Sequence, residues 1–238
     1  MSIRVRRRRF QLVPSSCRYK RSMNDIRQFE RIGDGLLVRA PAKINLSLLV
    51  AGKRPDGFHE LETVMAKIDW FDEITIERAT GAGIEFACQG PCWAPNDVTN
   101  LVYRAAELIL HACGRSDDVK LTLTKNIPAG SGLGSGSSDA AATLAGLNAY
   151  LDLGLSKPQL MDLAARLGSD IAFFLNGPLA FCTGRGEKIS ELPAGFDFVA
   201  VLILPGINSS TKEVYAHYQH DAALYGRLHG QIDRKSVV

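Results

Sequence analysis

The sequence predicts an α+β fold, with a β-rich first part followed by a mixture of helices and short strands. Three observations support this fold class. Apolar and polar residues alternate over parts of 36–78, a period of two that is typical of strands. From residue 99 onward, apolar residues recur at helical spacing, interrupted by short apolar runs. The hydrophobic content of 46% in 238 residues is enough for such a chain to bury a sizeable core.

The first expected elements are two short strands within residues 36–50, separated near Pro41 because a proline cannot donate a ladder hydrogen bond. A polar loop at 52–59 leads to an apolar segment at 61–70, and residues 73–78 alternate as a further strand. Alternation in the second short strand directs Ile44, Leu46 and Leu48 into the core. The opposite face is then expected to present Lys43, Asn45 and Ser47.

Three helices are expected in the second part. The first covers 99–113, with Thr99 or Asn100 as its cap and Gly114 as its stop. The second begins at Ser137 or Ser138 and ends near Leu151, and the third spans 156–168 with Ser156 as its cap. Short strands are predicted at 119–124, 179–182 and 198–204, and the residues from 217 onward suggest an amphipathic tail.

Charge is distributed unevenly along the chain. Residues 1–22 contain eight Lys or Arg and no acidic residue, which leaves 20 basic and 25 acidic residues elsewhere. The formal charge of +3 therefore reflects the head segment, and we expect no nucleic-acid partner. No apolar run reaches the length of a membrane span, about 18 residues, so no membrane partner is expected.

The basic head has three readings. It is a disordered tail, or it precedes a true start at Met23, or it is an organelle transit peptide, since it is Arg-rich, contains serine and lacks acidic residues. We prefer the first two and expect a cytoplasmic protein, with a plastid location as the alternative. The five cysteines, Cys17, Cys88, Cys92, Cys113 and Cys182, are irregularly spaced and predict free thiols and no metal site.

The most informative segment is a glycine-rich loop between an expected strand and an alanine-rich helix. Its glycines, at 130, 132, 134 and 136, leave main-chain amides unshielded and permit positive φ. Such amides, together with the start of the following helix, can bind a phosphate. The hydroxyls of Ser137 and Ser138 could contact phosphate or help to hold magnesium. A flexible linker is the alternative, but the loop continues directly into a strong helix start.

The loop pattern Pro-x-Gly-x-Gly-Leu-Gly-x-Gly-Ser-Ser-x-Ala-Ala, at 128–141, resembles the ATP loop of the GHMP kinases. Segments at 41–46 and 54–61 are similar to the first motif and the nucleotide-sugar loop of the branch that phosphorylates a cytidine-diphosphate-linked methylerythritol. Further matching pieces lie at 100–106, 167–175 and 183–187, so the resemblance runs from about Val38 to Pro205. It implies a GHMP-kinase N-terminal domain, which has the fold of ribosomal protein S5 domain 2.

The resemblance assigns roles to particular residues. Lys43 and Asp170 fall at the catalytic pair, with Asp170 accepting the hydroxyl proton and Lys43 beside it and the transferred phosphate. Taken alone, Asp170 would be interpreted as a helix cap and Lys43 as part of a solvated strand face. The remaining implied contacts are to ATP through Pro128, Gly130, Gly132, Leu133, Gly134, Gly136, Ser137 and Ser138, and to the acceptor through Asn45, Phe58, His59 and Thr211.

The implied activity is phosphorylation, by ATP with Mg²⁺, of the 2-hydroxyl of that cytidine-diphosphate polyol in the non-mevalonate isoprenoid route, by a monomer or homodimer. The segment after the position of Tyr215 departs from the family, because it contains no third glycine-rich motif. We therefore expect a basic extension at 1–35, an ATP-binding domain at 36–190 and an incomplete C-terminal domain at 191–238. The alternatives are a catalytically impaired nucleotide-binding protein, or a kinase for another small alcohol such as homoserine or mevalonate.

Overall fold

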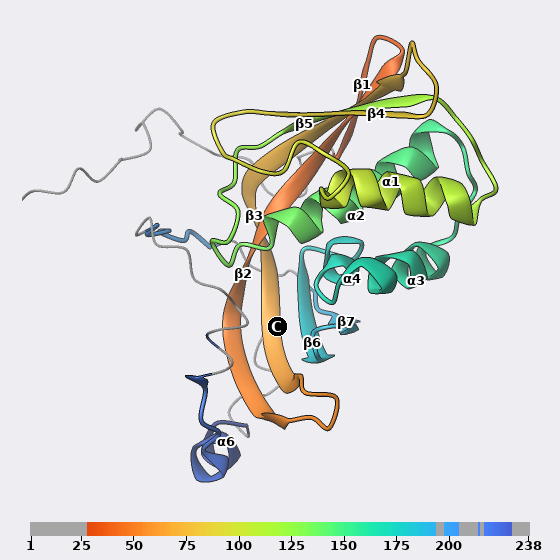
Figure 1. Ribbon diagram of the computed structural model, residues 1–238. Coiled ribbons are helices and arrows are strands. Elements are labelled where there is room, and N and C mark those ends of the chain that lie inside the picture. The colour runs from red at the N-terminus through yellow and green to blue at the C-terminus, as the bar shows by residue number, and fades with distance from the viewer. Residues whose placement is uncertain (1–27, 194–197, 205–213, 215–216, 230–238) are drawn as a thin grey trace, which may run out of the picture.

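The computed structural model describes residues 28–193, 198–204, 214 and 217–229, and its described residues form a seven-stranded sheet whose one face is covered by the helices of residues 101–174 (Figure 1). The strands are β1 (Phe29–Ile32), β2 (Gly35–Lys53), β3 (His59–Arg78), β4 (Ile84–Gln89), β5 (Val119–Thr124), β6 (Leu179–Gly184) and β7 (Lys188–Glu191). The helices are α1 (Leu101–Ala112), α2 (Ser135–Tyr150), α3 (Lys157–Leu167), α4 (Ile171–Phe174) and α6 (Ala222–His229). This mixed architecture confirms the predicted fold class.

A long antiparallel hairpin, β2 and β3, forms the centre of the sheet (Figure 1). The two short strands expected within 36–50 are one continuous strand, so that prediction is wrong. Pro41 is accommodated at a register shift, where Pro41 pairs with Phe71 but Ala42 pairs with Ile68. A bulge of this kind bends a strand without ending its ladder, because the extra residues are left unpaired.

Strand β3 has two different partners along its other edge. Its first part, residues 61–66, pairs with β6, and its last part, residues 73–78, pairs with β5. Between these two ladders, residues 67–72 of β3 pair with neither β5 nor β6. The sheet thus divides at this point, and the first turn of α2 and the short helix α4 lie beside the division (Figure 1).

Helix α2 packs unusually close to the sheet. A Cβ at Gly146 would lie 2.7 Å from Ile76 Cδ1 and 2.8 Å from Val38 Cγ2, so only glycine fits there. Ala140, Ala141 and Ala142 are buried on the same helix. The core that they share with strands β2, β3 and β5 and with helix α1 places the start of α2 firmly against β2.

The helix predictions are confirmed, with one shift. Asn100 caps α1, its side chain accepting a hydrogen bond from the Val102 amide at 2.9 Å. Ser156 forms a capping box with Gln159 at the start of α3. Helix α2 begins at Ser135, two or three residues earlier than expected, because the Ser138 amide already donates to the Gly134 carbonyl at 2.9 Å. The strands at 119–124 and 179–182 are also confirmed.

Three further predictions are corrected by the structure. Leu46 and Leu48 do not point into the core but are 42% and 46% exposed, because a register shift between Asn45 and Ser47 interrupts the alternation that the prediction assumed. Residues 198–204 form no strand, and Val199 is 97% exposed, because no described strand pairs with them. The extension predicted for 1–35 ends too late, since Phe29–Ile32 pairs with β2 as β1, while residues 1–27 lie outside the described part.

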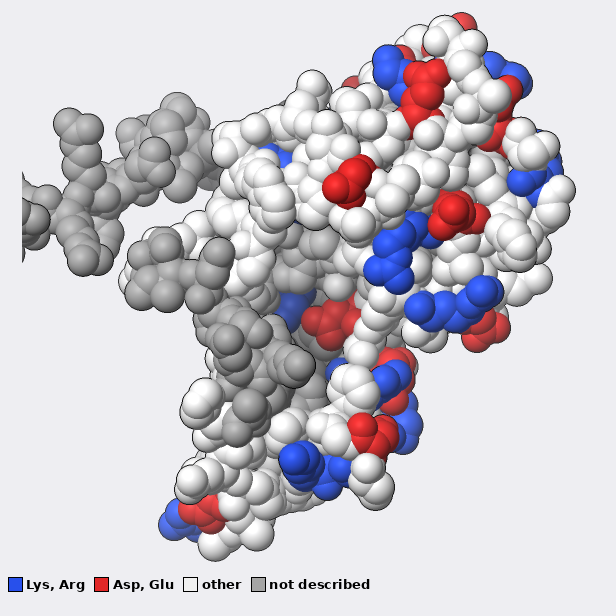
Figure 2. All heavy atoms as spheres, viewed as in Figure 1, with Lys and Arg blue, Asp and Glu red and all other residues white. Residues whose placement is uncertain are grey.

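Among the described residues, no helix is both long enough and apolar enough to span a membrane. Lys and Arg are interspersed with Asp and Glu on the face drawn in Figure 2, so the described part of that face carries no extended basic surface.

Candidate active site

The glycine-rich loop joins β5 to α2 and holds three residues in left-handed backbone conformations. Gly130, Gly132 and Gly134 have φ of 71°, 76° and 69°. Residues with a Cβ rarely adopt this region, which explains why the loop repeats glycine at every second position. Gly134 is the N-cap of α2, so Gly136, Ser137 and Ser138 lie in the first turn of that helix.

The main-chain amides of this loop are available. Among the described residues, no acceptor receives a hydrogen bond from an amide between Ala129 and Gly134. The first amides of α2 also lack acceptors within the helix, as at every helix start. Ser138 Oγ is buried and has no hydrogen-bond partner in the described structure. Free amides, a helix N-terminus and an unsatisfied hydroxyl together provide the donors that a phosphate requires.

Lys43 of β2 runs directly past this loop. Its amide donates to the Leu133 carbonyl at 2.9 Å, which ties the loop to the strand. A Cβ at Gly134 would lie 3.0 Å from Lys43 Cγ and 3.2 Å from Lys43 Cε. Lys43 Nζ donates to Asn45 Oδ1 at 2.6 Å, and Asn45 Nδ2 donates to Thr63 Oγ1 at 2.7 Å. Lys43 is only 7% exposed, and through the exposed Asn45 a partly buried polar chain connects it to Thr63 in the middle of the hairpin.

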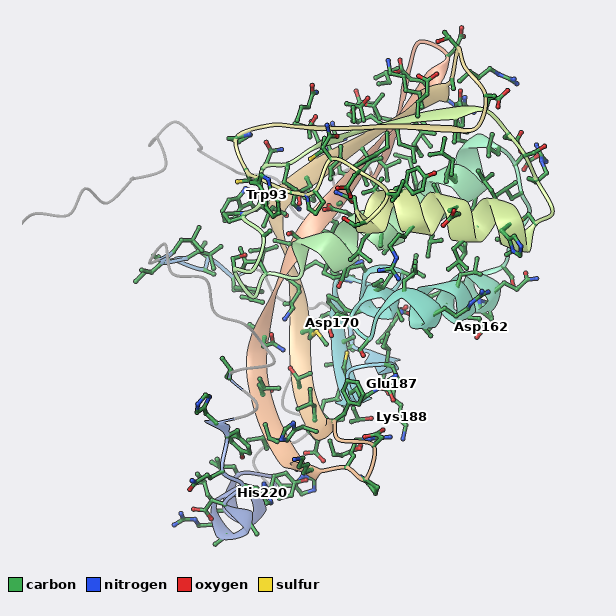
Figure 3. All side chains as sticks on the ribbon, viewed as in Figure 1. Trp93, Asp162, Asp170, Glu187, Lys188 and His220 are labelled. Carbon is green, nitrogen blue, oxygen red and sulfur yellow. The ribbon has the colours of Figure 1, made fainter. Side chains whose placement is uncertain are left out.

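Asp170 lies at the start of α4, on the side of the sheet that carries the helices (Figure 3). It occupies the N-cap position, but its side chain makes no cap hydrogen bond, so the carboxyl is not used as a cap. A Cβ at Gly186 would lie 3.3 Å from Asp170 Oδ1, which places the carboxyl against the turn between β6 and β7. Close approach of that turn requires glycine, since Gly186 also has φ of 112°.

The charges of Lys43 and Asp170 interact, although the two side chains form no direct ion pair. Burial lowers the pKa of Lys43, and the nearby Asp170 and Cys182 oppose that effect. Burial and the Asp170 charge raise the pKa of Cys182 to about 12, with Lys43 acting in the opposite direction. The charges of these three groups thus act on one another, and Cys182 stays a neutral thiol. Cys182 was predicted as a free thiol, but its place beside the pair was not.

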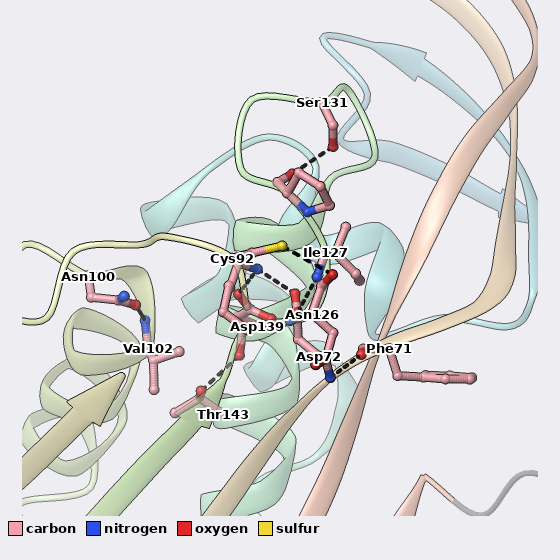
Figure 4. Close-up of polar contacts among 12 residues, drawn as sticks. Phe71, Asp72, Cys92, Asn100, Val102, Asn126, Ile127, Ser131, Asp139 and Thr143 are labelled. Carbon is pink, nitrogen blue, oxygen red and sulfur yellow. Dashed lines mark hydrogen bonds and ion pairs between the residues drawn. The ribbon is translucent and has the colours of Figure 1, made fainter. Parts of the chain in front are cut away.

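A buried ionic cluster supports the other side of the glycine loop (Figure 4). Lys125 follows β5 and donates to Asp72 of β3 and, at 2.8 Å, to Asp139 of α2. Asp72 also accepts hydrogen bonds from the amides of Asn126 and Ile127, at 2.6 Å and 2.8 Å, whereas Asp139 Oδ1 is buried and has no partner within the described part of the chain. These contacts fix the two ends of the loop to the sheet. The sequence offered no signal for this cluster, because each residue is an ordinary member of its own segment.

The far end of the β2–β3 hairpin carries the residues expected to bind the acceptor. Phe58 is 51% exposed, and the guanidinium carbon of Arg185 lies 4.8 Å from its ring centroid. The His59 ring meets the Tyr218 ring edge-on, with centroids 6.1 Å apart. Asn45 lies between these aromatics and the loop along β2. Thr211, the remaining expected contact, lies outside the described residues.

Comparison with known proteins connects this site to a family. The profile of the GHMP kinases N terminal domain matches residues 100–178. A 4-diphosphocytidyl-2-C-methyl-D-erythritol kinase of Geobacillus sp. (strain WCH70) is 43% identical over 198 residues, which are 83% of this chain and 68% of the relative. The chain belongs to the 4-diphosphocytidyl-2-C-methyl-D-erythritol kinase family. The predicted membership of the GHMP kinases is thereby confirmed.

Two further relatives of this kinase family agree. The 4-diphosphocytidyl-2-C-methyl-D-erythritol kinase of Syntrophomonas wolfei subsp. wolfei is 44% identical over 180 residues, 76% of this chain and 62% of the relative. A crystal structure of 4-(cytidine 5'-diphospho)-2C-methyl-D-erythritol kinase has a TM-score of 0.62 and 37% identity, covering 76% of this chain and 63% of that one. The chain therefore spans about two thirds of the length of its kinase relatives.

The sequence missed several residues around the site of this kinase. Thr63 completes the polar chain from Lys43, and Gly186 and Arg185 bring the β6–β7 turn to Asp170 and Phe58. The Thr-Gly-Arg-Gly-Glu segment at 183–187 was recognised only as part of a resemblance, so a signal existed for that turn. No local pattern marks Thr63, because its role depends on pairing between β2 and β3.

Proposed function

We propose that this protein is an ATP-dependent kinase that phosphorylates the 2-hydroxyl of 4-diphosphocytidyl-2-C-methyl-D-erythritol in the non-mevalonate isoprenoid pathway. The observation that carries the proposal is the meeting of three segments far apart in sequence: the glycine loop, Lys43 and Asp170. Transfer of a phosphoryl group depends mainly on positioning and on neutralising charge, and these three segments supply both.

In this proposal Asp170 accepts the proton of the acceptor hydroxyl. Its carboxyl is not used to cap α4, so both oxygens remain available to an acceptor. Lys43 places a positive charge between Asp170 and the loop, where negative charge increases during transfer. Asn45 and Thr63 hold the Lys43 ammonium in place through their hydrogen bonds. Burial of this lysine strengthens its interaction with charge, because water screens it less.

The residues present fit ATP and magnesium. The open amides of 129–134, the start of α2 and the unsatisfied hydroxyl of Ser138 would hold the triphosphate. Among the described residues, no cluster of three or more acidic, histidine or cysteine side chains could by itself bind a metal. This matches the usual preference of Mg²⁺ for one or two protein ligands plus phosphates and water. When bound, Mg·ATP supplies the transferable phosphoryl group and part of its charge neutralisation.

Specificity for a cytidine-bearing acceptor is assigned to the hairpin end. Phe58 offers a half-exposed ring on which a base can stack, and His59 offers a polar edge beside it. A small alcohol such as homoserine or mevalonate has no base to occupy these rings. We therefore favour the cytidine-diphosphate acceptor over these alcohols.

A coupled ADP-release assay tests the proposal. The wild-type chain is offered ATP, magnesium and 4-diphosphocytidyl-2-C-methyl-D-erythritol, with mevalonate and homoserine in parallel reactions. We expect the wild-type chain to release ADP with the cytidine substrate but not with mevalonate or homoserine, and we expect Asp170→Asn to lose this ADP release. ADP release with mevalonate or homoserine instead, or turnover that is unchanged in Asp170→Asn, would reject the assigned acceptor or base.

A second candidate is nucleotide binding without turnover. Several apolar residues of 198–204 are largely exposed: Val199 is 97%, Val201 86% and Ile203 76% exposed. An exposed apolar stretch of this kind is typical of an interaction surface, so turnover could require a partner that covers it. A chain that binds an ATP analogue but releases no ADP with any of the three alcohols would support this candidate. For either function we propose a cytoplasmic location, since the relatives compared are bacterial.

A further inference from the structure

The turn between β6 and β7, residues 184–187, connects the two ends of the proposed active site. Gly186 lies against the Asp170 carboxyl, and Arg185 extends over the Phe58 ring with its guanidinium carbon 4.8 Å from the ring centroid. One short turn therefore contacts both the proposed base and the proposed cytosine platform. None of the roles assigned above uses Arg185.

The backbone of this turn is rigidly held. The Arg185 amide donates to Glu187 Oε2 at 2.5 Å, and the Gly186 amide donates to the Thr183 carbonyl at 3.2 Å. A Cβ at Gly184 would lie 2.7 Å from Glu187 Oε1, so the glutamate folds tightly over the turn. The position of the Arg185 Cα is thus fixed, while its side chain extends into the space beside Phe58.

Among the described residues the Arg185 guanidinium forms no ion pair, although its charge interacts with the nearby Asp56 carboxyl and helps to lower the pKa of that group. The neighbouring Arg54 differs, because it pairs with Asp56 at 3.1 Å and with Glu60 at 2.6 Å. The cation–π contact of Arg185 is worth only about 0.5–1 kcal/mol at an exposed site. It is therefore weak enough to be exchanged for a stronger partner.

A diphosphate is the partner that this arrangement suits. A guanidinium binds phosphate oxygens through two parallel charge-assisted hydrogen bonds, and these are about twice as strong as neutral ones. In the proposed acceptor, the diphosphate lies between the cytidine and the polyol. Arg185 likewise lies on the turn that touches both Phe58 and Asp170. The match is one of both charge and position.

We propose that Arg185 is a specificity-determining residue that binds the diphosphate of the acceptor substrate. This inference rests on the proposed function for the identity of the acceptor. In the absence of substrate the guanidinium rests on Phe58, and on binding it engages the diphosphate while the base stacks on the ring. Arg185 thereby selects a charged acceptor over an uncharged one of similar shape.

Calorimetric titration with CDP and with cytidine tests the inference without turnover. A saturating non-hydrolysable ATP analogue is present throughout, so that CDP cannot occupy the glycine loop. The wild-type chain is expected to bind CDP at least about tenfold more tightly than cytidine, as charge-assisted hydrogen bonds predict. Arg185→Gln should remove most of that preference and change cytidine affinity by less than about twofold, with Arg185→Lys intermediate because it keeps the charge but not the fork.

The matched control is Arg115→Gln, which makes the same chemical change in the loop between α1 and β5, where Arg115 pairs with Asp117 at 2.7 Å. It should leave both affinities unchanged. An Arg185→Gln chain that keeps the wild-type ratio of CDP to cytidine affinity overturns the inference, as does a wild-type chain without any preference. Thermal unfolding confirms that each variant is folded, and Arg185→Lys serves if the glutamine variant is not.

Kinetics separate this inference from the proposed function. With active wild-type protein, Arg185→Gln should raise KM for the cytidine acceptor by about tenfold while KM for ATP stays constant. Wild-type protein that binds CDP through Arg185 but releases no ADP would refute the proposed function and leave the inference standing. Full turnover by the wild-type chain, with KM for the cytidine acceptor unchanged in Arg185→Gln, would support the proposed function and refute the inference about Arg185.

Discussion

Replacing Asp139 by Asn should change how the stability of the chain depends on pH. Asp139 is the fifth residue of α2, with one carboxyl oxygen 2.8 Å from Lys125 Nζ and the other buried without a hydrogen-bond partner among the described residues. Burial raises the pKa of Asp139 to about 8, helped by the charge of Asp72 and opposed by that of Lys125. Asp72 competes for the same ammonium with two additional amide donors, so Asp139 is the carboxyl that retains a proton.

The size of the effect follows from proton linkage. An unfolded aspartate titrates near pH 4, so between about pH 4 and 8 the folded chain holds a proton that the unfolded chain has released. The contribution of this group is therefore complete below about pH 4 and is lost as the pH rises toward 8. One bound proton corresponds to about 1.4 kcal/mol per pH unit, so the loss of stability is roughly 3 kcal/mol between pH 5.5 and 7.5. Asparagine does not titrate and removes this dependence.

Urea unfolding at several pH values, without nucleotide or magnesium, measures the difference between wild-type and Asp139→Asn chains. We expect the advantage of the wild-type chain to shrink by roughly 3 kcal/mol between pH 5.5 and 7.5. Subtracting the unfolding free energy of the variant from that of the wild-type chain cancels the titration of groups common to both, so the remaining pH dependence belongs to Asp139. Stability curves that stay parallel across this range would show that Asp139 is ionised in the folded chain and would refute the reasoning.

Three other outcomes are expected. Asp170→Asn should lower turnover by about 10²- to 10⁴-fold and leave calorimetric binding of an ATP analogue intact, since a proton acceptor is lost and the loop is not; weakened analogue binding would argue against the assigned role. Gly134→Ala places an alanine in a left-handed conformation, which costs about 1–2 kcal/mol, and its Cβ collides with Lys43 and Phe174, so ATP-analogue binding and turnover should both fall. Gly132→Ala has open space around its Cβ and should cost only the left-handed conformation, about 1–2 kcal/mol of stability. Lys67→Met leaves the carbonyls of Phe174 and Asn176 without their donor and should destabilise the chain by about 1–3 kcal/mol in urea unfolding, a loss that a wild-type-like midpoint would contradict.

Much of the site could be predicted because its parts are local. The glycine loop needs a left-handed backbone conformation at 130, 132 and 134, and only glycine adopts that conformation without strain. The loop could therefore be predicted from its local sequence alone. The caps of α1 and α3 depend on side chains within three residues of the helix start, and these too were predicted correctly. The order of strands and helices follows from hydrophobic periodicity in the same way.

The errors concern features that depend on distant neighbours. Alternation predicted that Leu46 and Leu48 face inward, but pairing with β3 introduces a register shift between Asn45 and Ser47, and the two faces of β2 are exchanged beyond it. The apolar run at 198–204 has the composition of a strand, yet a strand forms only where another offers its edge. Pro41 was expected to end a strand, and pairing with β3 instead absorbs it in a bulge.

The sequence by itself determined the glycine-rich loop, the caps of its helices and the family to which the chain belongs. Only the tertiary structure decided that Lys43, Asp170 and Cys182 lie near enough for their charges to interact, that Lys125 joins Asp72 to Asp139, and that Arg185 reaches Phe58. The physical reason is that backbone conformation and periodicity are encoded over a few residues. The meeting of charges is set by strand pairing and helix packing, which join segments that the sequence keeps far apart.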